Sequence, residues 1–305
     1  MQARVGDMEL DGIWSSLCFP SFLPGFAGQR LTLGPHDADL AFAIMRAYNS
    51  WHLESWCGPY PDRFIPNQIP WLRDPFRAAE EIRRNAVLGF RAVSFSEAPH
   101  LLGLPSIHSR YWDPFLGACE ETGTVVCLHV GSSGTMPSTS PDAPVLATAA
   151  GFFIPAISTA CEWIASEIPL RFPSIKICLS EGGIGWVPGL MDRFDHLNAR
   201  HRRRDYGWPS ESISPVDIMR RNFWYCALDD PSGIAFRHRI GMDRIMIESD
   251  YPHSDSSWPS TQDLLRRHMQ DVPKVEQQAM CWKNACAVFR LPEPRELPAS
   301  SPPIS

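Results

Sequence analysis

The sequence predicts an α/β fold in which parallel strands alternate with helices, either as a (β/α) barrel or as an open doubly wound sheet. Short apolar runs alternate with amphipathic segments along the whole chain. The 305 residues, 44% of them hydrophobic, can build one large core. Polar residues end several apolar runs, as they do at the carboxyl ends of barrel strands. These three observations favour a single enzyme-sized domain.

The first quarter of the chain predicts two strands and two helices. Gly12–Phe19 is a short apolar run typical of a buried strand. Asp37 can cap a helix over Ala38–Trp56, in which apolar residues recur at helical spacing. Phe64–Ile69 predicts a weaker strand, and Pro75–Asn85 predicts an amphipathic helix. The order is therefore strand, helix, strand, helix.

The next unit repeats this order. Phe90–Phe95 predicts a strand that ends at Glu97. Asp113 offers an N-cap, and Pro114 offers the first helical position, of a helix that stops near Gly123. We expect this helix to pack against the strand before it.

The middle of the chain contains two further strands. Val125–Leu128 predicts a strand, and the residues rich in Gly, Ser and Pro from Gly131 to Pro144 predict a long loop of the kind that often covers a site. An apolar helix is expected over Ala147–Ile168, then a strand over Ile175–Ser180 and a helix that runs through Asp195.

The last part predicts strands over Phe223–Cys226 and Ile245–Ile247, with a helix over Ser232–Ile240 between them. Two terminal helices complete a domain over residues 1–290, and residues 291–305 form a Pro-rich tail expected to be disordered. The count is about seven strands, whereas a complete barrel of this type has eight. We therefore expect an incomplete barrel.

Charge and cysteine content exclude several classes of protein. The net charge of −6 argues against nucleic acid, and the basic run Arg200–Arg204 is typical of a solvated face. Nine cysteines without a C-x-x-C pair indicate a reducing compartment. The N-terminal residues lack a signal-peptide core, and no uncharged stretch is long enough to span a membrane, so we expect a cytoplasmic protein.

Three polar residues form the candidate site. His129 follows TVVCL, Glu181 follows IKICLS, and Asp250 follows RIMIES, so each lies at the carboxyl end of an expected strand. Because these ends converge on one face of a barrel, we expect the three side chains to share one site.

Several motifs resemble one known family. HVGSSG begins at His129, RFPSIKICLSEGGIGWVP spans Arg171–Pro188, and ESDYPHSDSSWP spans Glu248–Pro259. GLPSIHSRYWDPFLGACEETG, over Gly103–Gly123, and the segment DGI add to the likeness. In this order the motifs resemble the amidohydrolase-related family, in the branch that includes aminocarboxymuconate semialdehyde decarboxylase.

The resemblance implies a TIM-like barrel of the metal-dependent hydrolase type. It implies a metal-dependent hydrolase or non-oxidative decarboxylase that acts on a small carboxylate or carbonyl compound, aromatic in some cases, with zinc or manganese as the divalent ion. His129 and Asp250 correspond to metal-site residues, and Glu181 stands where decarboxylases of this branch commonly have a second His. Relatives carry further ligands on a first strand that this sequence lacks, and they are frequently dimers.

We therefore expect His129, Asp250 and Glu181 to bind the metal, and Asp250, Glu181 and His253 to act in catalysis. His108 and Trp186 are expected to border the substrate pocket.

Two other functions remain open. The chain could be an inactive paralogue or fragment that serves as a subunit of an oligomer, or a glycosidase that uses Glu97 and Glu181 as paired carboxylates.

Overall fold

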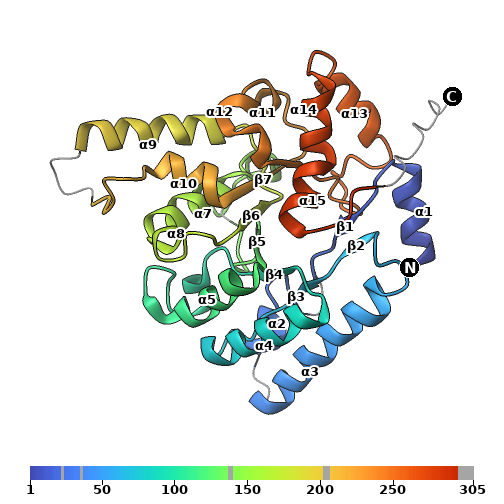
Figure 1. Cartoon of the computed structure of the whole chain (residues 1–305), viewed down its shortest axis with the longest axis vertical. Helices are drawn as coiled ribbons and strands as arrows, with labels where there is room; N and C mark the ends of the chain where they lie inside the picture. The colour runs from blue at the N-terminus through green and yellow to red at the C-terminus, as the bar shows by residue number, and fades with distance from the viewer. Residues whose placement is uncertain (22–23, 35–36, 137–139, 202–206, 295–305) are drawn as a thin grey trace.

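The computed structural model describes residues 1–21, 24–34, 37–136, 140–201 and 207–294. Strands run through the centre of the molecule and helices lie outside them (Figure 1). The strands are β1 (Ser16–Leu17), β2 (Phe64–Ile65), β3 (Asn67–Gln68), β4 (Ala92–Phe95), β5 (Val125–His129), β6 (Ile177–Ser180), β7 (Phe223–Ala227) and β8 (Ile245–Ile247).

The helices occupy segments before, between and after the strands in sequence. They are α1 (Gln2–Leu10), α2 (Gln29–Thr32), α3 (Ala38–Trp51), α4 (Pro75–Leu88), α5 (Asp113–Thr122), α6 (Val145–Ala150), α7 (Ile154–Ala165), α8 (Ile168–Arg171), α9 (Val187–His201), α10 (Pro215–Asn222), α11 (Pro231–Ala235), α12 (Arg237–Ile240), α13 (Thr261–His268), α14 (Lys274–Gln278) and α15 (Asn284–Phe289). Short 3₁₀ and π turns are η1 (His52–Cys57), η2 (Pro99–Leu102), η3 (Arg110–Trp112), η4 (Met242–Arg244) and η5 (Ala279–Lys283). Among the described helices, none is both long and apolar enough to cross a membrane.

All strand pairs are parallel, which confirms the predicted α/β class. β1 pairs with β2, and β3 to β8 form a second sheet in sequence order. Pro66 separates β2 from β3, so the expected strand over Phe64–Ile69 is two short strands in succession, each pairing with a different neighbour. The expected seven strand positions are therefore present, and in the described part of the chain no ladder joins β1 to β8.

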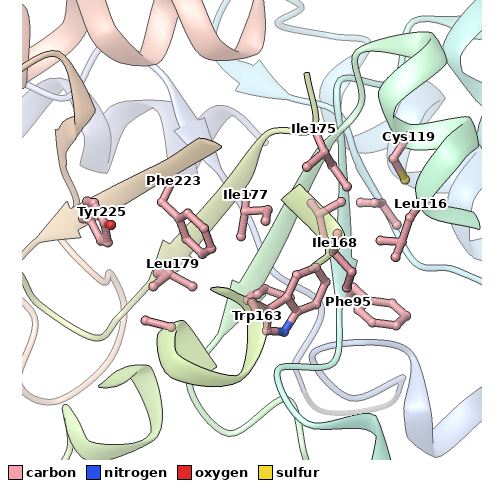
Figure 2. Close-up of a cluster of buried hydrophobic side chains, with 14 of the residues drawn as sticks. Phe95, Leu116, Cys119, Trp163, Ile168, Ile175, Ile177, Leu179, Phe223 and Tyr225 are labelled. Atoms are coloured by element: carbon pink, nitrogen blue, oxygen red, sulfur yellow. The ribbon is translucent and has the colours of Figure 1, made fainter. Parts of the chain in front are cut away.

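Side chains along the strands alternate between two apolar cores. Val126 and Leu128 of β5 belong to the large core between strands and helices, whereas Val125 and Cys127 belong to a smaller core on the opposite face. Figure 2 shows the large core, where Trp163 of α7 lies near residues of the strands. Because alternation has a period of two, His129 faces the same side as Cys127. The smaller core is thus the inner side, on which the site lies.

Two helix predictions need correction. The helix expected over Ala147–Ile168 is divided into α6, α7 and α8, because Gly151 follows α6 and the positive φ of 61° at Glu167 turns the chain before α8. Asp113 does not cap α5 but is its first residue, since η3 leads directly into the helix and Ser109 caps η3 instead.

The helix expected over Ser232–Ile240 is likewise two helices, α11 and α12, which Phe236 separates. The Asp37 side chain accepts a hydrogen bond from Leu40 N, as expected of an N-cap, although α3 ends at Trp51 and η1 continues it as a π turn. Parts of three predicted segments lie outside the described residues: 137–139 of the long loop, 202–204 of the basic run, and 295–305 of the tail.

Candidate active site

A cavity of about 410 Å³ lies at the carboxyl ends of β5, β6 and β8. Its lining includes His129, Glu181, Asp250 and His253, all of which the sequence analysis proposes as site residues. The strand ends therefore bring together, as expected, side chains that are far apart in the sequence.

These four side chains form a continuous chain of contacts. His129 Nε2 lies 3.2 Å from Glu181 Oε2. His253 Nδ1 lies 2.9 Å from Glu181 Oε1 and 2.7 Å from Asp250 Oδ2. Ligand atoms of Glu181, Asp250 and His253 all lie within 4.8 Å of one another, a spacing that could hold one metal ion.

The His129 ring is fixed on three sides. Its Nδ1 lies 2.6 Å from the carbonyl oxygen of Val130, so Nδ1–H donates and the lone pair of Nε2 faces Glu181. Phe26 stacks on the ring with centroids 4.0 Å apart, and Phe19 meets it edge-on at 4.6 Å. Burial lowers the His129 pKa to about 4, so the imidazole is neutral and able to ligate near neutral pH.

Glu181 and Asp250 both occupy the left-handed region, with φ of 66° and 56°. Residues other than glycine rarely adopt this conformation, and they do so where the surroundings hold them, often at functional sites. Burial, and secondarily the charge of Asp250, raises the pKa of Glu181 well above its usual range. Glu181 Oε1 is buried and makes no well-aligned hydrogen bond, although His253 is near.

Glu248 is a site residue that the sequence analysis missed. It lines the cavity, and its Oε1 accepts a 2.6 Å hydrogen bond from Glu181 N. Burial raises its pKa to about 8, and the charge of Asp250 adds to this effect. The signal was present in the strand pattern, because Met246 faces the inner core and Glu248 is two residues further on.

This set of side chains fits a divalent cation. Three carboxyl groups, of Glu181, Glu248 and Asp250, converge with two imidazoles in one cavity. The raised pKa values of Glu181 and Glu248 show that negative charge is poorly solvated here, and a cation would stabilise the ionised carboxylates. Mixed nitrogen and oxygen donors suit zinc or manganese.

His108 and Trp186 do not line this cavity. His108 Nε2 lies 2.7 Å from Glu162 Oε2 on the half-exposed surface. Trp186 Nε1 donates to Gly182 O, and its ring packs edge-on to Tyr225 in the large core. Whether an aromatic side chain at such a position faces the cavity or the core depends on tertiary packing, which the sequence pattern does not encode.

Glu97 is buried below the loop that follows β5, and it does not line the cavity. Its Oε1 accepts hydrogen bonds from Gly131 N at 2.9 Å and from Ser133 Oγ at 2.9 Å. The carboxyl group therefore fixes the chain beyond His129. A glycosidase needs both carboxylates in the cavity, and of the pair Glu97 and Glu181 only Glu181 is there.

Three solved structures with a similar fold are decarboxylases. A 5-carboxyvanillate decarboxylase from Sphingomonas paucimobilis has a TM-score of 0.74 and 20% identity, covering 95% of this chain and 83% of that chain. A 2,6-dihydroxybenzoate decarboxylase from Rhizobium has a TM-score of 0.74 and 22% identity, covering 95% and 88%. A dihydroxybenzoic acid decarboxylase from Polaromonas sp. JS666, with bound manganese and the inhibitor 2-nitroresorcinol, has a TM-score of 0.73 and 20% identity, covering 95% and 86%.

At these identities the likeness shows the fold, which agrees with the predicted barrel architecture. No curated protein is significantly similar to the chain in sequence. The amidohydrolase family, in contrast, matches residues 20–291, a span that contains β2 to β8 and the four cavity residues His129, Glu181, Asp250 and His253. The chain therefore belongs to the amidohydrolase family.

Proposed function

We propose that this protein is a metal-dependent, non-oxidative decarboxylase of a small aromatic carboxylate. The observation that carries the proposal is the meeting of His129, Glu181, Asp250 and His253 in one cavity of about 410 Å³. Aromatic side chains, among them Phe19 and Phe26, line the same cavity. The similarity in fold to decarboxylases of aromatic acids supports this choice of substrate class.

The metal would be held by Glu181, Asp250 and His253, with His129 completing the set through Nε2. When bound, a divalent ion supplies a positive charge that polarises a substrate carboxylate or hydroxyl and acidifies bound water. The neutral state of His129 and its fixed tautomer suit this role.

The remaining steps use the protein's own side chains. Asp250, whose side chain is 18% exposed, delivers a proton to the ring carbon that bears the carboxylate. The bond from this carbon to the carboxylate then breaks, carbon dioxide leaves, and the electron pair restores the aromatic ring. His253 is half exposed and its Nδ1 lies 2.7 Å from Asp250 Oδ2, so solvent reaches this side of the cavity, and water returns the proton to Asp250.

The experiment is a turnover assay on protein loaded with manganese or zinc. Hydroxybenzoates are supplied as candidate substrates, and carbon dioxide and the decarboxylated phenol are measured together. We expect equal amounts of the two products, and loss of both in Asp250→Asn. Asp271→Asn, which changes an exposed acid outside the cavity, is the matched control.

Hydrolysis is the competing reaction of the same family. A parallel panel of lactones and esters tests it, because water would then add to a carbonyl and no carbon dioxide would form. Turnover of these compounds alone, or metal-loaded protein that is inert toward every hydroxybenzoate, would refute the decarboxylase proposal.

A further inference from the structure

We propose that Arg4, in the N-terminal helix α1, binds the carboxylate of the substrate in this cavity. The inference rests on the proposed function, because it specifies an anionic substrate for the same site. It also assigns a role to a helix that lies outside residues 20–291, the span matched by the family.

Arg4 is the only Arg or Lys among the described residues that line the cavity. The other ionisable groups there include three acids, Glu181, Glu248 and Asp250. A carboxylate ligand would be repelled by these acids unless positive charge balanced them. A bound metal supplies part of that charge, and Arg4 supplies a fixed charge that does not depend on the metal.

The guanidinium group of Arg4 is held in position by Tyr251, but not all of its hydrogen-bond donors have a partner. Its Nη1 donates to the carbonyl oxygen of Tyr251 at 3.2 Å, and its Cζ lies 4.4 Å from the centre of the Tyr251 ring. Its Nε is buried and has no hydrogen-bond partner. Guanidinium groups carry five N–H donors in a planar fork that matches a carboxylate, so donors remain for a ligand.

Helix α1 is hydrogen-bonded to the loop that carries Asp250. Tyr251 Oη donates to Asp7 Oδ2 at 2.7 Å, and Trp258 Nε1 donates to Asp7 O at 3.1 Å. Buried Asp11 accepts from Thr261 N at 2.9 Å and from Thr261 Oγ1 at 2.6 Å. These contacts fix the position of Arg4 relative to Asp250 before any ligand binds, which reduces the entropic cost of binding.

The shape of the cavity agrees with a ring that carries the carboxylate. Phe19, Phe26, Trp56 and Tyr251 line it, and a planar ring can pack against such side chains. The volume of about 410 Å³ is at the small end of the range for ligand pockets. We therefore infer a monocyclic aromatic acid whose carboxylate lies against Arg4.

Binding of benzoate and of its neutral analogue benzamide tests the inference. Affinity is measured by calorimetry, with and without manganese, on wild type and on Arg4→Gln, Arg4→Lys and Arg267→Gln. Arg267 is exposed on α13 and does not line the cavity, so it controls for the loss of one positive charge. Thermal unfolding of each variant establishes that it is folded.

We expect Arg4→Gln to weaken benzoate binding at least tenfold, with benzamide binding unchanged. Arg4→Lys keeps the charge without the fork and is expected to lose less, and Arg267→Gln is expected to match wild type. Equal benzoate affinity in Arg4→Gln and wild type, an equal loss for benzamide, or no benzoate binding by wild type would each overturn the inference. Since no turnover is measured, an inactive but benzoate-binding protein would refute the proposed reaction and leave this assignment standing.

Discussion

The Glu248 carboxylate accepts a 2.6 Å hydrogen bond from the backbone N–H of Glu181, and so joins the ends of β8 and β6. Glu181 is in the left-handed region, with φ of 66°, and this bond holds it there. Glu248 therefore fixes the direction in which the Glu181 side chain enters the cavity, without needing to touch a bound metal.

Removal of the Glu248 carboxyl group should weaken the binding of a metal ion at this site. Glu248→Ala is expected to lower manganese affinity about tenfold to 100-fold, the usual cost of losing a group that orients a ligand. Glu248→Gln retains an acceptor oxygen and should lose less. Calorimetric titration of the metal-free proteins measures both affinities, and equal losses in the two variants would exclude this orienting role.

Binding of a divalent ion should also stabilise the fold. A ligand at 100 times its Kd stabilises the native state by about 2.7 kcal/mol, so the melting temperature should rise when manganese is added. Glu181→Gln should abolish this rise because a ligand is lost. The same variant, without metal, should melt above metal-free wild type, since an acid with a raised pKa has been removed from a buried position.

Differential scanning calorimetry, with and without a chelator, measures both effects. Asp271→Asn, on the surface, should respond to manganese as wild type does. An undiminished rise in Glu181→Gln would show that the ion binds elsewhere.

The succession of parallel strands and the meeting of the candidate side chains in one cavity were predictable because they depend on local patterns. Apolar runs that end in His129 and Glu181 specify buried strands, and parallel strands must present their carboxyl ends on one face. The period of two would also have placed Glu248 on the inner side, two residues after Met246.

The position of Arg4 beside the cavity was not predictable in the same way. Its contact with Tyr251 joins residues 247 positions apart, and α1 is positioned by Asp7 and Asp11, whose partners lie in the loop after β8 and at the start of α13. No periodicity within Gln2–Leu10 encodes these partners. The same reason explains Trp186, whose direction is decided by packing against Tyr225.

His52 should make the stability of the fold depend on pH. Its side chain is buried, and Nε2 accepts from Asn67 N at 3.4 Å. Burial lowers its pKa to about 4, whereas an unfolded His titrates near 6.5. Between these values the unfolded chain binds the proton and the folded chain does not, so the free energy of unfolding falls as the pH falls from about 6.5 to about 4. The full contribution is on the order of 3 kcal/mol.

Urea unfolding at several pH values between 4 and 7 measures this dependence. His52→Gln keeps an acceptor for Asn67 N–H but does not titrate, so its stability should fall less over the same range. His100→Gln, at an exposed position, is the control and should follow wild type. Parallel curves for all three proteins would assign the pH dependence to other groups.

Glu97 should stabilise the fold and the position of His129, although it does not line the cavity. Its Oε1 accepts from Gly131 N, Ser133 N and Ser133 Oγ at 2.9, 3.4 and 2.9 Å. Glu97→Ala leaves these buried donors without a partner, and an unsatisfied buried donor costs about 1 to 3 kcal/mol. We expect the free energy of unfolding to fall by about 2 to 5 kcal/mol.

The comparison that isolates this effect is Glu120→Ala, because Glu120 also accepts from a backbone N–H, that of Ser174, but at the surface. There water replaces the lost partner, and the expected loss is at most about 1 kcal/mol. Glu97→Ala should in addition weaken manganese binding, because the loop after His129 loses the hydrogen bonds that hold it in position. Glu120→Ala should leave manganese binding unchanged. If both variants lost the same stability and bound manganese like wild type, Glu97 would have no part in positioning the site.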